Sequence, residues 1–187
     1  MTQQSIFNHE GRAVPYIVEG EGPIGLVLIA AAALDTDPLG VVAHYLAEEA
    51  GFHVVRIGAD TTSGDREERA SDALAVMDHL GFADAWIGGY GSGGTIARTL
   101  TGTHPERANG LLLLGVEEDG TSLAPMIPVL VIQGSDDAAL PPENGERLRA
   151  TAPERTSVKT IAGADHRFPV THLMDTAVTI EEYLDWD

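Results

Sequence analysis

The sequence predicts an α/β fold with a mostly parallel sheet, helices on both faces and an antiparallel hairpin at the N-terminus. Two observations predict it. Apolar runs such as residues 25–30 have no polar alternation, as expected for strands buried on both faces of a parallel sheet. The segments between these runs repeat apolar residues every three or four positions, which indicates helices. A regular alternation of such strands and helices is typical of parallel sheets.

The expected elements follow one another along the whole chain, with no repeat or linker, which predicts a single domain over residues 1–187. The hairpin comprises residues 5–8 and 13–18 and is closed by a glycine-rich turn. Further strands are expected at residues 25–30, 53–57, 85–88, 111–115, 129–132 and 158–161. Helices are expected from Asp37 and Pro38 up to Gly51, then at residues 65–80, 95–102, 143–150 and 171–184. Their starts and stops follow from proline, aspartate and glycine signals.

Composition excludes several classes of function. The chain has no cysteine, which rules out disulfides, thiolate zinc sites and a cysteine nucleophile. A formal net charge of −18 argues against nucleic acid or an anionic membrane surface as partners. Residues 1–10 show no basic stretch before an apolar run, and no apolar run approaches the roughly 20 residues that span a bilayer. We therefore expect a cytoplasmic protein.

A glycine-rich turn, Gly-Tyr-Gly-Ser-Gly-Gly, follows the strand expected at residues 85–88. Gly89, Gly91 and Gly94 match the dinucleotide fingerprint G-x-G-x-x-G, and Glu117 stands where that motif places its ribose-binding acid. This interpretation is the weaker one, because a dinucleotide fingerprint normally opens its fold and three strand-bearing units precede the turn here.

The competing interpretation is a nucleophile elbow, G-x-S-x-G, in which small flanking residues let a strand turn sharply into a helix. Gly89 and Gly93 are then the flanking residues, and the centre is Gly91.

Two downstream segments favour the elbow. Residues 134–141, Gly-Ser-Asp-Asp-Ala-Ala-Leu-Pro, and residues 163–166, Gly-Ala-Asp-His, each follow an expected strand. Together with the glycine turn and the phrase His-Pro-Glu-Arg at residues 104–107, they resemble the α/β-hydrolase superfamily over nearly the whole chain.

The resemblance implies an α/β-hydrolase fold without a cap domain and an esterase or acyl-hydrolase type of site. It makes Asp137 the acid and His166 the base, in the chain order nucleophile, acid, histidine. The chemistry supports this pairing, because a histidine acts as a base only when a partner such as a carboxylate fixes its tautomer and orientation.

The pattern departs from the family at Gly91, which has no side chain and cannot form an acyl-enzyme. Ser92 is the less favoured nucleophile, since centring the elbow on it puts bulky Tyr90 two residues before the centre. We expect the Ser92 hydroxyl to bond a free backbone amide at the helix start, and the Ser92 amide to be an oxyanion donor.

The loop after residues 25–30 is a second departure, because family members often carry His-Gly where this chain has a run of alanines. By alignment, Ala32 offers the other oxyanion amide. Only 13 residues separate Gly115 from Val129, where many relatives insert a lid, so we expect an open site that Val116, Leu123, Met126 and Phe168 could line.

Three functions remain open: an enzyme that uses Asp137 and His166 without a covalent intermediate, a non-catalytic ligand-binding or interaction protein, and a serine esterase inactivated by a serine-to-glycine change at Gly91. The expected ligand is a small ester or carbonyl compound. We expect no cofactor and no metal, since none of the seven histidines lies in an H-E-x-x-H spacing. Dinucleotide binding through Gly89, Gly91 and Gly94 is the lesser alternative.

Overall fold

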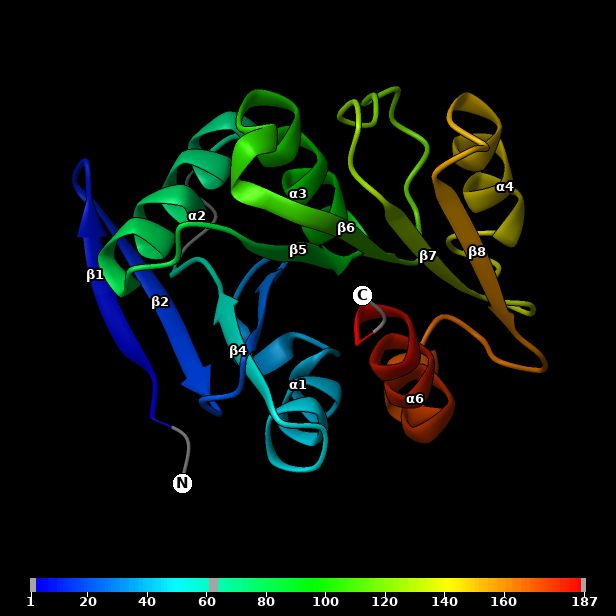
Figure 1. Cartoon of the computed structure of the whole chain (residues 1–187), viewed down its shortest axis with the longest axis horizontal. Coiled ribbons are helices and arrows are strands. Elements are labelled where there is room, and N and C mark those ends of the chain that lie inside the picture. The colour runs from blue at the N-terminus through cyan, green and yellow to red at the C-terminus, as the bar shows by residue number, and fades with distance from the viewer. Residues whose placement is uncertain (1–2, 61–63, 186–187) are drawn as a thin grey trace.

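The computed structural model describes residues 3–60 and 64–185, and its centre is one eight-stranded sheet with the order β1-β2-β4-β3-β5-β6-β7-β8 (Figure 1). The strands are β1 (Ser5–His9), β2 (Arg12–Glu19), β3 (Ile24–Ile29), β4 (Phe52–Ile57), β5 (Ala85–Tyr90), β6 (Ala108–Leu114), β7 (Val129–Gly134) and β8 (Thr156–Ile161). β1 pairs antiparallel with β2, and β2 antiparallel with β4, whereas all other neighbours are parallel. The domain expected over residues 1–187 includes residues 1–2, 61–63 and 186–187, which lie outside the described ranges.

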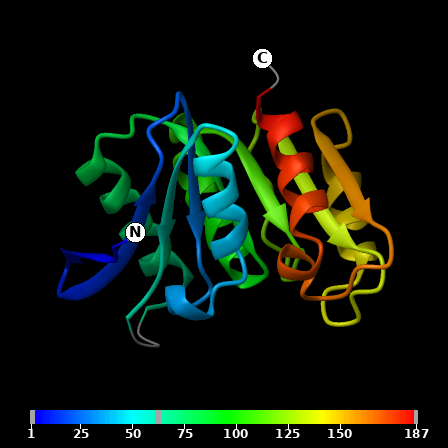
Figure 2. The same cartoon turned by 90° about the horizontal axis from the view of Figure 1, so that it is seen from below.

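Helices cover both faces of the sheet (Figures 1 and 2). One face carries α2 (Arg66–Leu80), α3 (Ser92–Thr103) and α4 (Pro142–Thr151), and the other carries α1 (Gly40–Glu48) and α6 (Leu173–Leu184). Short turns complete the list: η1 (Leu34–Thr36), η2 (Pro105–Arg107) and α5 (Phe168–Thr171). No helix in the described part of the chain is long and apolar enough to cross a membrane.

The core has two layers because successive strand residues point to opposite faces of the sheet. In β3, Val27 and Ile29 pack in the layer under α2 and α3, whereas Leu26 and Leu28 pack in the layer under α1 and α6. All four are at most 1% exposed. The continuous apolar runs of the sequence are therefore strands covered on both faces.

The predicted α/β architecture with its N-terminal hairpin is confirmed, and the differences lie at element ends. β5 continues to Tyr90, and α3 begins at Ser92 instead of residue 95. The last helical segment is split by His172 into α5 and α6. The start expected at Asp37 is wrong, since α1 begins at Gly40.

The order of the strands places two loops side by side at one edge of the sheet. After β3 the chain passes to β4 on one side, and then returns to β5 on the other side of β3. The loops that follow β3 and β5 therefore start at neighbouring strand ends and then lead away in opposite directions. In open α/β sheets this switch point is where ligands bind.

Two glycines, one in β5 and one in α3, bring these elements against the backbone at the end of β3. A Cβ atom on Gly93 would lie 2.1 Å from the carbonyl oxygen of Ile29, and one on Gly89 would lie 2.6 Å from the same oxygen. Both distances are far inside van der Waals contact, so only glycine fits at these positions. The first turn of α3 is thereby held directly against the end of β3.

Gly93→Ala should destabilise the fold by about 1–3 kcal/mol or more, because the added methyl overlaps backbone atoms that cannot rotate away. Gly102→Ala, in the same helix, is the matched control. A Cβ there would meet nothing within 4 Å, so alanine should be neutral or stabilising by up to about 1 kcal/mol. Urea denaturation of both variants measures the difference, and equal effects would show that the close packing does not limit stability.

Candidate active site

The turn between β5 and α3 has the geometry of a sharp strand-to-helix reversal. Gly91 forms its apex with φ 57° and ψ −123°, a backbone conformation that favours glycine. Its amide donates to the carbonyl oxygens of Leu114 and Gly115 at 3.0 and 3.1 Å, which ties the apex to the end of β6. A Cβ at Gly91 would meet only the Cδ1 atom of Leu140, at 3.6 Å. The apex therefore has space for a side chain that it does not carry.

The close packing of Gly89 and Gly93 against the end of β3 gives a physical reason for small residues two positions before and after the apex, which is the elbow pattern. Glu117, the residue that a dinucleotide site would need, accepts a hydrogen bond of 2.7 Å from the Thr95 hydroxyl of α3. The geometry thus supports the elbow over the dinucleotide interpretation.

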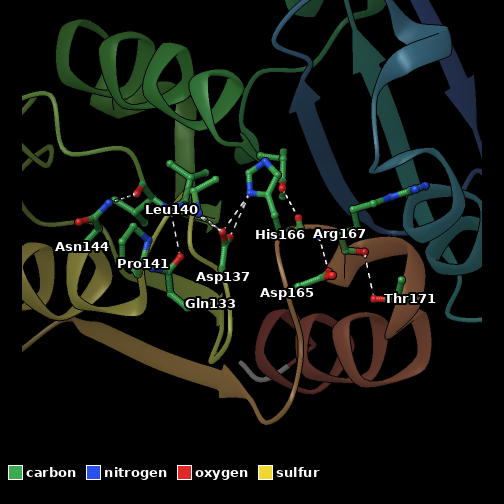
Figure 3. A network of polar contacts seen from close by, with 12 residues as sticks. Gln133, Asp137, Leu140, Pro141, Asn144, Asp165, His166, Arg167 and Thr171 are labelled. Carbon is green, nitrogen blue, oxygen red and sulfur yellow. Dashed lines mark hydrogen bonds and ion pairs between the residues drawn. The ribbon is translucent and has the colours of Figure 1, made fainter.

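Asp137 and His166 point toward one another from the loops after β7 and β8 (Figure 3). The Nδ1 atom of His166 lies 3.1 and 3.2 Å from the two carboxylate oxygens. The Asp137 side chain is 1% exposed and the His166 side chain 44%. Since Nδ1 faces the carboxylate, Nε2 is the ring nitrogen available to take a proton from solvent or substrate.

Backbone amides also hold the Asp137 carboxylate in place, in addition to its contact with His166. Its Oδ1 atom accepts hydrogen bonds from the amides of Ala139 and Leu140, at 3.0 and 2.9 Å. The neighbouring Asp136 amide donates to the carbonyl of Ala164 at 2.8 Å, which joins the loop of the acid to the loop of the histidine. The pair is therefore positioned by backbone contacts as well as by its own hydrogen bond.

Tyr90, at the end of β5, contacts both the ring and the backbone of His166. Its ring lies 5.2 Å from the imidazole of His166, and its hydroxyl donates to the His166 carbonyl oxygen. Burial, with smaller contributions from the charges of Asp137 and Asp165, raises the pKa of Tyr90 above its ordinary value. The phenol thus stays a hydrogen-bond donor at neutral pH. In the sequence, Tyr90 stands out only as a bulky neighbour of the apex.

Ser92 is the first residue of α3 and is exposed. The hydrogen bond expected from its hydroxyl to a backbone amide is wrong, because Gly91 occupies the N-cap position and the helix has no side-chain cap. The amide of Ser92 belongs to the first helical turn, whose N–H groups have no intrahelical partner. Its role as an oxyanion donor stays a prediction.

The alanine loop after β3 follows an ordinary backbone path. Among the described non-glycine residues, those with positive φ are Glu10 and Met126, and neither lies in this loop. The alanines therefore adopt ordinary backbone angles that do not require glycine. Ala31 and Ala32 are exposed and directly follow the strand end that touches α3. The role expected for the Ala32 amide likewise stays a prediction.

The connection between β6 and β7 contains no helix or strand. It borders a cavity of about 380 Å³ that Arg98, Glu117 and Arg147 help to line. Of the four residues expected to line the site, Val116 and Phe168 are buried in the core, and Met126 is 91% exposed. Val116 also lines a small pocket together with Gly91, and Leu123 lines the larger cavity with Val116. Leu140, which was not among the expected residues, lies next to the apex as well.

Neither Asp137 nor His166 belongs to a metal-binding arrangement. Within residues 3–60 and 64–185, no three or more histidine, aspartate or glutamate side chains come together as a possible metal site.

No protein-family model matches the chain. Solved structures resemble it over nearly its full length. An esterase from Thermogutta terrifontis is 16% identical with a TM-score of 0.79, covering 99% of this chain and 98% of its own. An α/β hydrolase from a sediment metagenome of the Mar Chica lagoon, Morocco, is 18% identical with a TM-score of 0.80, covering 97% and 98%. A bromoperoxidase from Bacillus anthracis is 15% identical with a TM-score of 0.80, covering 99% and 100%. The chain therefore has the α/β-hydrolase fold.

Proposed function

We propose that this protein hydrolyses small carboxylic esters by general-base catalysis, with Asp137 and His166 activating water and no acyl-enzyme. The observation that carries the proposal is the hydrogen-bonded pair Asp137–His166, at 3.1 Å, beside an apex without a side chain. A buried carboxylate that orients an exposed imidazole is the arrangement that general-base catalysis needs.

The proposed reaction has two proton transfers, the first from water to His166 and the second from His166 to the leaving alcohol. Nε2 of His166 takes a proton from water while the water oxygen bonds to the ester carbonyl carbon, and the carbonyl oxygen becomes an oxyanion. The tetrahedral intermediate then collapses, its bond to the alcohol oxygen breaks, and the imidazolium returns the proton to that leaving oxygen. Asp137 stabilises the imidazolium between the two transfers.

Two backbone features support a site for the oxyanion. The Ser92 amide lies at the N-terminus of α3, where the helix dipole and free N–H groups favour negative charge. The alanine loop, with Ala32, lies beside it at the switch point of the sheet. The likeness to an esterase supports this reaction class at the level of the fold.

The second candidate is a serine esterase that has lost its nucleophile. The geometry of the apex favours it, because Gly91 keeps a positive φ and a Cβ there would have ordinary contact with Leu140 alone. The two candidates differ in what they require of the unaltered chain, since only the first turns over substrate with Gly91 in place.

If the proposal holds, the unaltered chain hydrolyses 4-nitrophenyl acetate and His166→Ala lowers kcat/KM about 100-fold, the smaller of the effects expected for a general base. His44→Ala is the matched control for unspecific imidazole catalysis. His44 also pairs through Nδ1 with a buried carboxylate, Glu19, at 2.9 Å, but Glu19 lies opposite Val54 near the start of β4, at the other edge of the sheet. Equal rates for the two variants would rule out His166 as the base.

Gly91→Ser should gain, or restore, ester hydrolysis through an acyl-enzyme, because the new hydroxyl would add the nucleophile that the proposed base, its acid and the Ser92 amide lack. The double variant Gly91→Ser/His166→Ala should lose that gain. A fluorophosphonate probe should label Gly91→Ser at position 91 and should not label the unaltered chain, at Ser92 or elsewhere. Peptide mass spectrometry locates the label. Labelling at Ser92, or a double variant as fast as Gly91→Ser, would contradict the assignment of the apex.

A further inference from the structure

The loop that follows β3 has its carbonyl groups occupied by protein donors. The carbonyl oxygens of five successive residues accept hydrogen bonds: Ala30 and Ala31 from Arg69, Ala32 from the Ala59 amide, Ala33 from the Thr36 amide, and Leu34 from the Asp37 amide. Because isolated loop carbonyls are otherwise satisfied by water, this row of bonds fixes how each peptide unit of the loop is turned.

The amides of the same loop are used differently. The Ala30 amide still belongs to the sheet and donates to Ile57 at 2.8 Å. The amides of Ala31 and Ala32 donate no hydrogen bond to any residue of the described ranges. In a trans peptide the C=O and N–H groups point in opposite directions. Carbonyls held toward the protein therefore turn these two amides away from it.

Arg69, on α2, is the group that holds the first two of these peptide units. Its Nη2 atom donates to the Ala30 carbonyl at 2.6 Å and its Nη1 atom to the Ala31 carbonyl at 2.9 Å. The residue is 8% exposed, and burial lowers the pKa of its guanidinium while the nearby charge of Asp72 opposes that shift. The Asp72 carboxylate itself binds Arg12, at 2.7–3.1 Å.

Burying a charged group is unfavourable unless its hydrogen bonds are well made. The guanidinium of Arg69 is nevertheless buried, and it binds two consecutive carbonyls beside the elbow. The carbonyl oxygen just before them, that of Ile29, contacts the first turn of α3 at Gly93, so the clamped peptides begin next to the amide of Ser92.

We propose that Arg69 is a positioning residue that, by binding the carbonyls of Ala30 and Ala31, presents the amides of Ala31 and Ala32 to an oxyanion at the apex. The inference rests on the proposed function. It also accounts for a loop without glycine, because the guanidinium, and not an unusual backbone angle, sets the direction of the peptides. A planar guanidinium can bind two carbonyls at once, which an ammonium group does poorly.

Arg107 offers a matched control. It also binds two consecutive loop carbonyls, those of Phe82 and Ala83, at 2.6 Å each. That loop precedes β5 and lies at the opposite edge of the sheet from the elbow. Arg107→Met therefore removes the same kind of clamp without touching the site.

The first experiment uses the unaltered chain and does not need catalysis. Acetate, whose carboxylate resembles an oxyanion, is titrated into ¹⁵N-labelled protein while the amide shifts of Ala31, Ala32 and Ser92 are followed by NMR. Saturable shifts at all three amides are expected in the unaltered chain and in Arg107→Met. In Arg69→Met the shifts of Ala31 and Ala32 should disappear while that of Ser92 persists.

The second experiment places the same substitutions in the Gly91→Ser background. Arg69→Met should lower kcat for 4-nitrophenyl acetate about 10- to 100-fold with KM within about twofold, somewhat less than the loss of a whole oxyanion donor. Arg107→Met should change neither. Arg69→Lys, which keeps the charge, should give an intermediate kcat and serves if the methionine variant does not fold.

The outcomes separate the two proposals. Acetate-dependent shifts of Ala31 and Ala32 that survive in Arg69→Met, or that vanish equally in Arg107→Met, overturn the role of Arg69. So does the absence of these shifts from the unaltered chain. An unaltered chain that keeps the acetate shifts but does not hydrolyse 4-nitrophenyl acetate overturns the proposed hydrolysis alone.

Discussion

The contact between the backbone of Gly93 and the carbonyl of Ile29 is the constraint on which the rest of the site depends. It brings the first turn of α3 against the end of β3 more closely than any other residue type would allow. The apex at Gly91, the amide of Ser92 and the alanine loop are thereby gathered at the switch point of the sheet. The acid and the histidine reach the same place from β7 and β8, whose loops are joined to one another by hydrogen bonds.

Arginine side chains donate to backbone carbonyls in loops of this protein, as backbone amides do in its helices and strands. Arg98 on α3 donates to the carbonyls of Glu117 and Thr121 in the helix-free connection between β6 and β7, as Arg69 and Arg107 do in two other loops. Burial lowers the pKa of Arg98, and the charge of Asp119 partly opposes this.

Sequence reasoning found the features that depend on local pattern. Apolar runs located the buried strands, and the resemblance of residues 134–141 and 163–166 to α/β-hydrolase segments indicated Asp137 and His166, which the structure brings together. It did not find the features that depend on contacts between residues far apart in the chain. Asp37 was expected to start a helix, but it caps the end of η1 and its carboxylate pairs with Arg56, at 3.7 Å. Helix α1 begins only at Gly40. Arg69 lies 38 residues from Ala31, and nothing in the helical pattern of α2 marks it as a clamp.

Glycine at the apex also bears on how such a chain would change over time. The conformation of Gly91 costs glycine little, whereas another residue held at this positive φ would store about 1–3 kcal/mol of strain. Losing a nucleophile here would raise stability, and regaining one would lower it. Since most proteins lie close to the stability they need, a change from glycine to a nucleophile at this position is the destabilising direction. Lineages with this elbow would thus be expected to keep the glycine unless selection for turnover, or a compensating mutation elsewhere in the fold, came first.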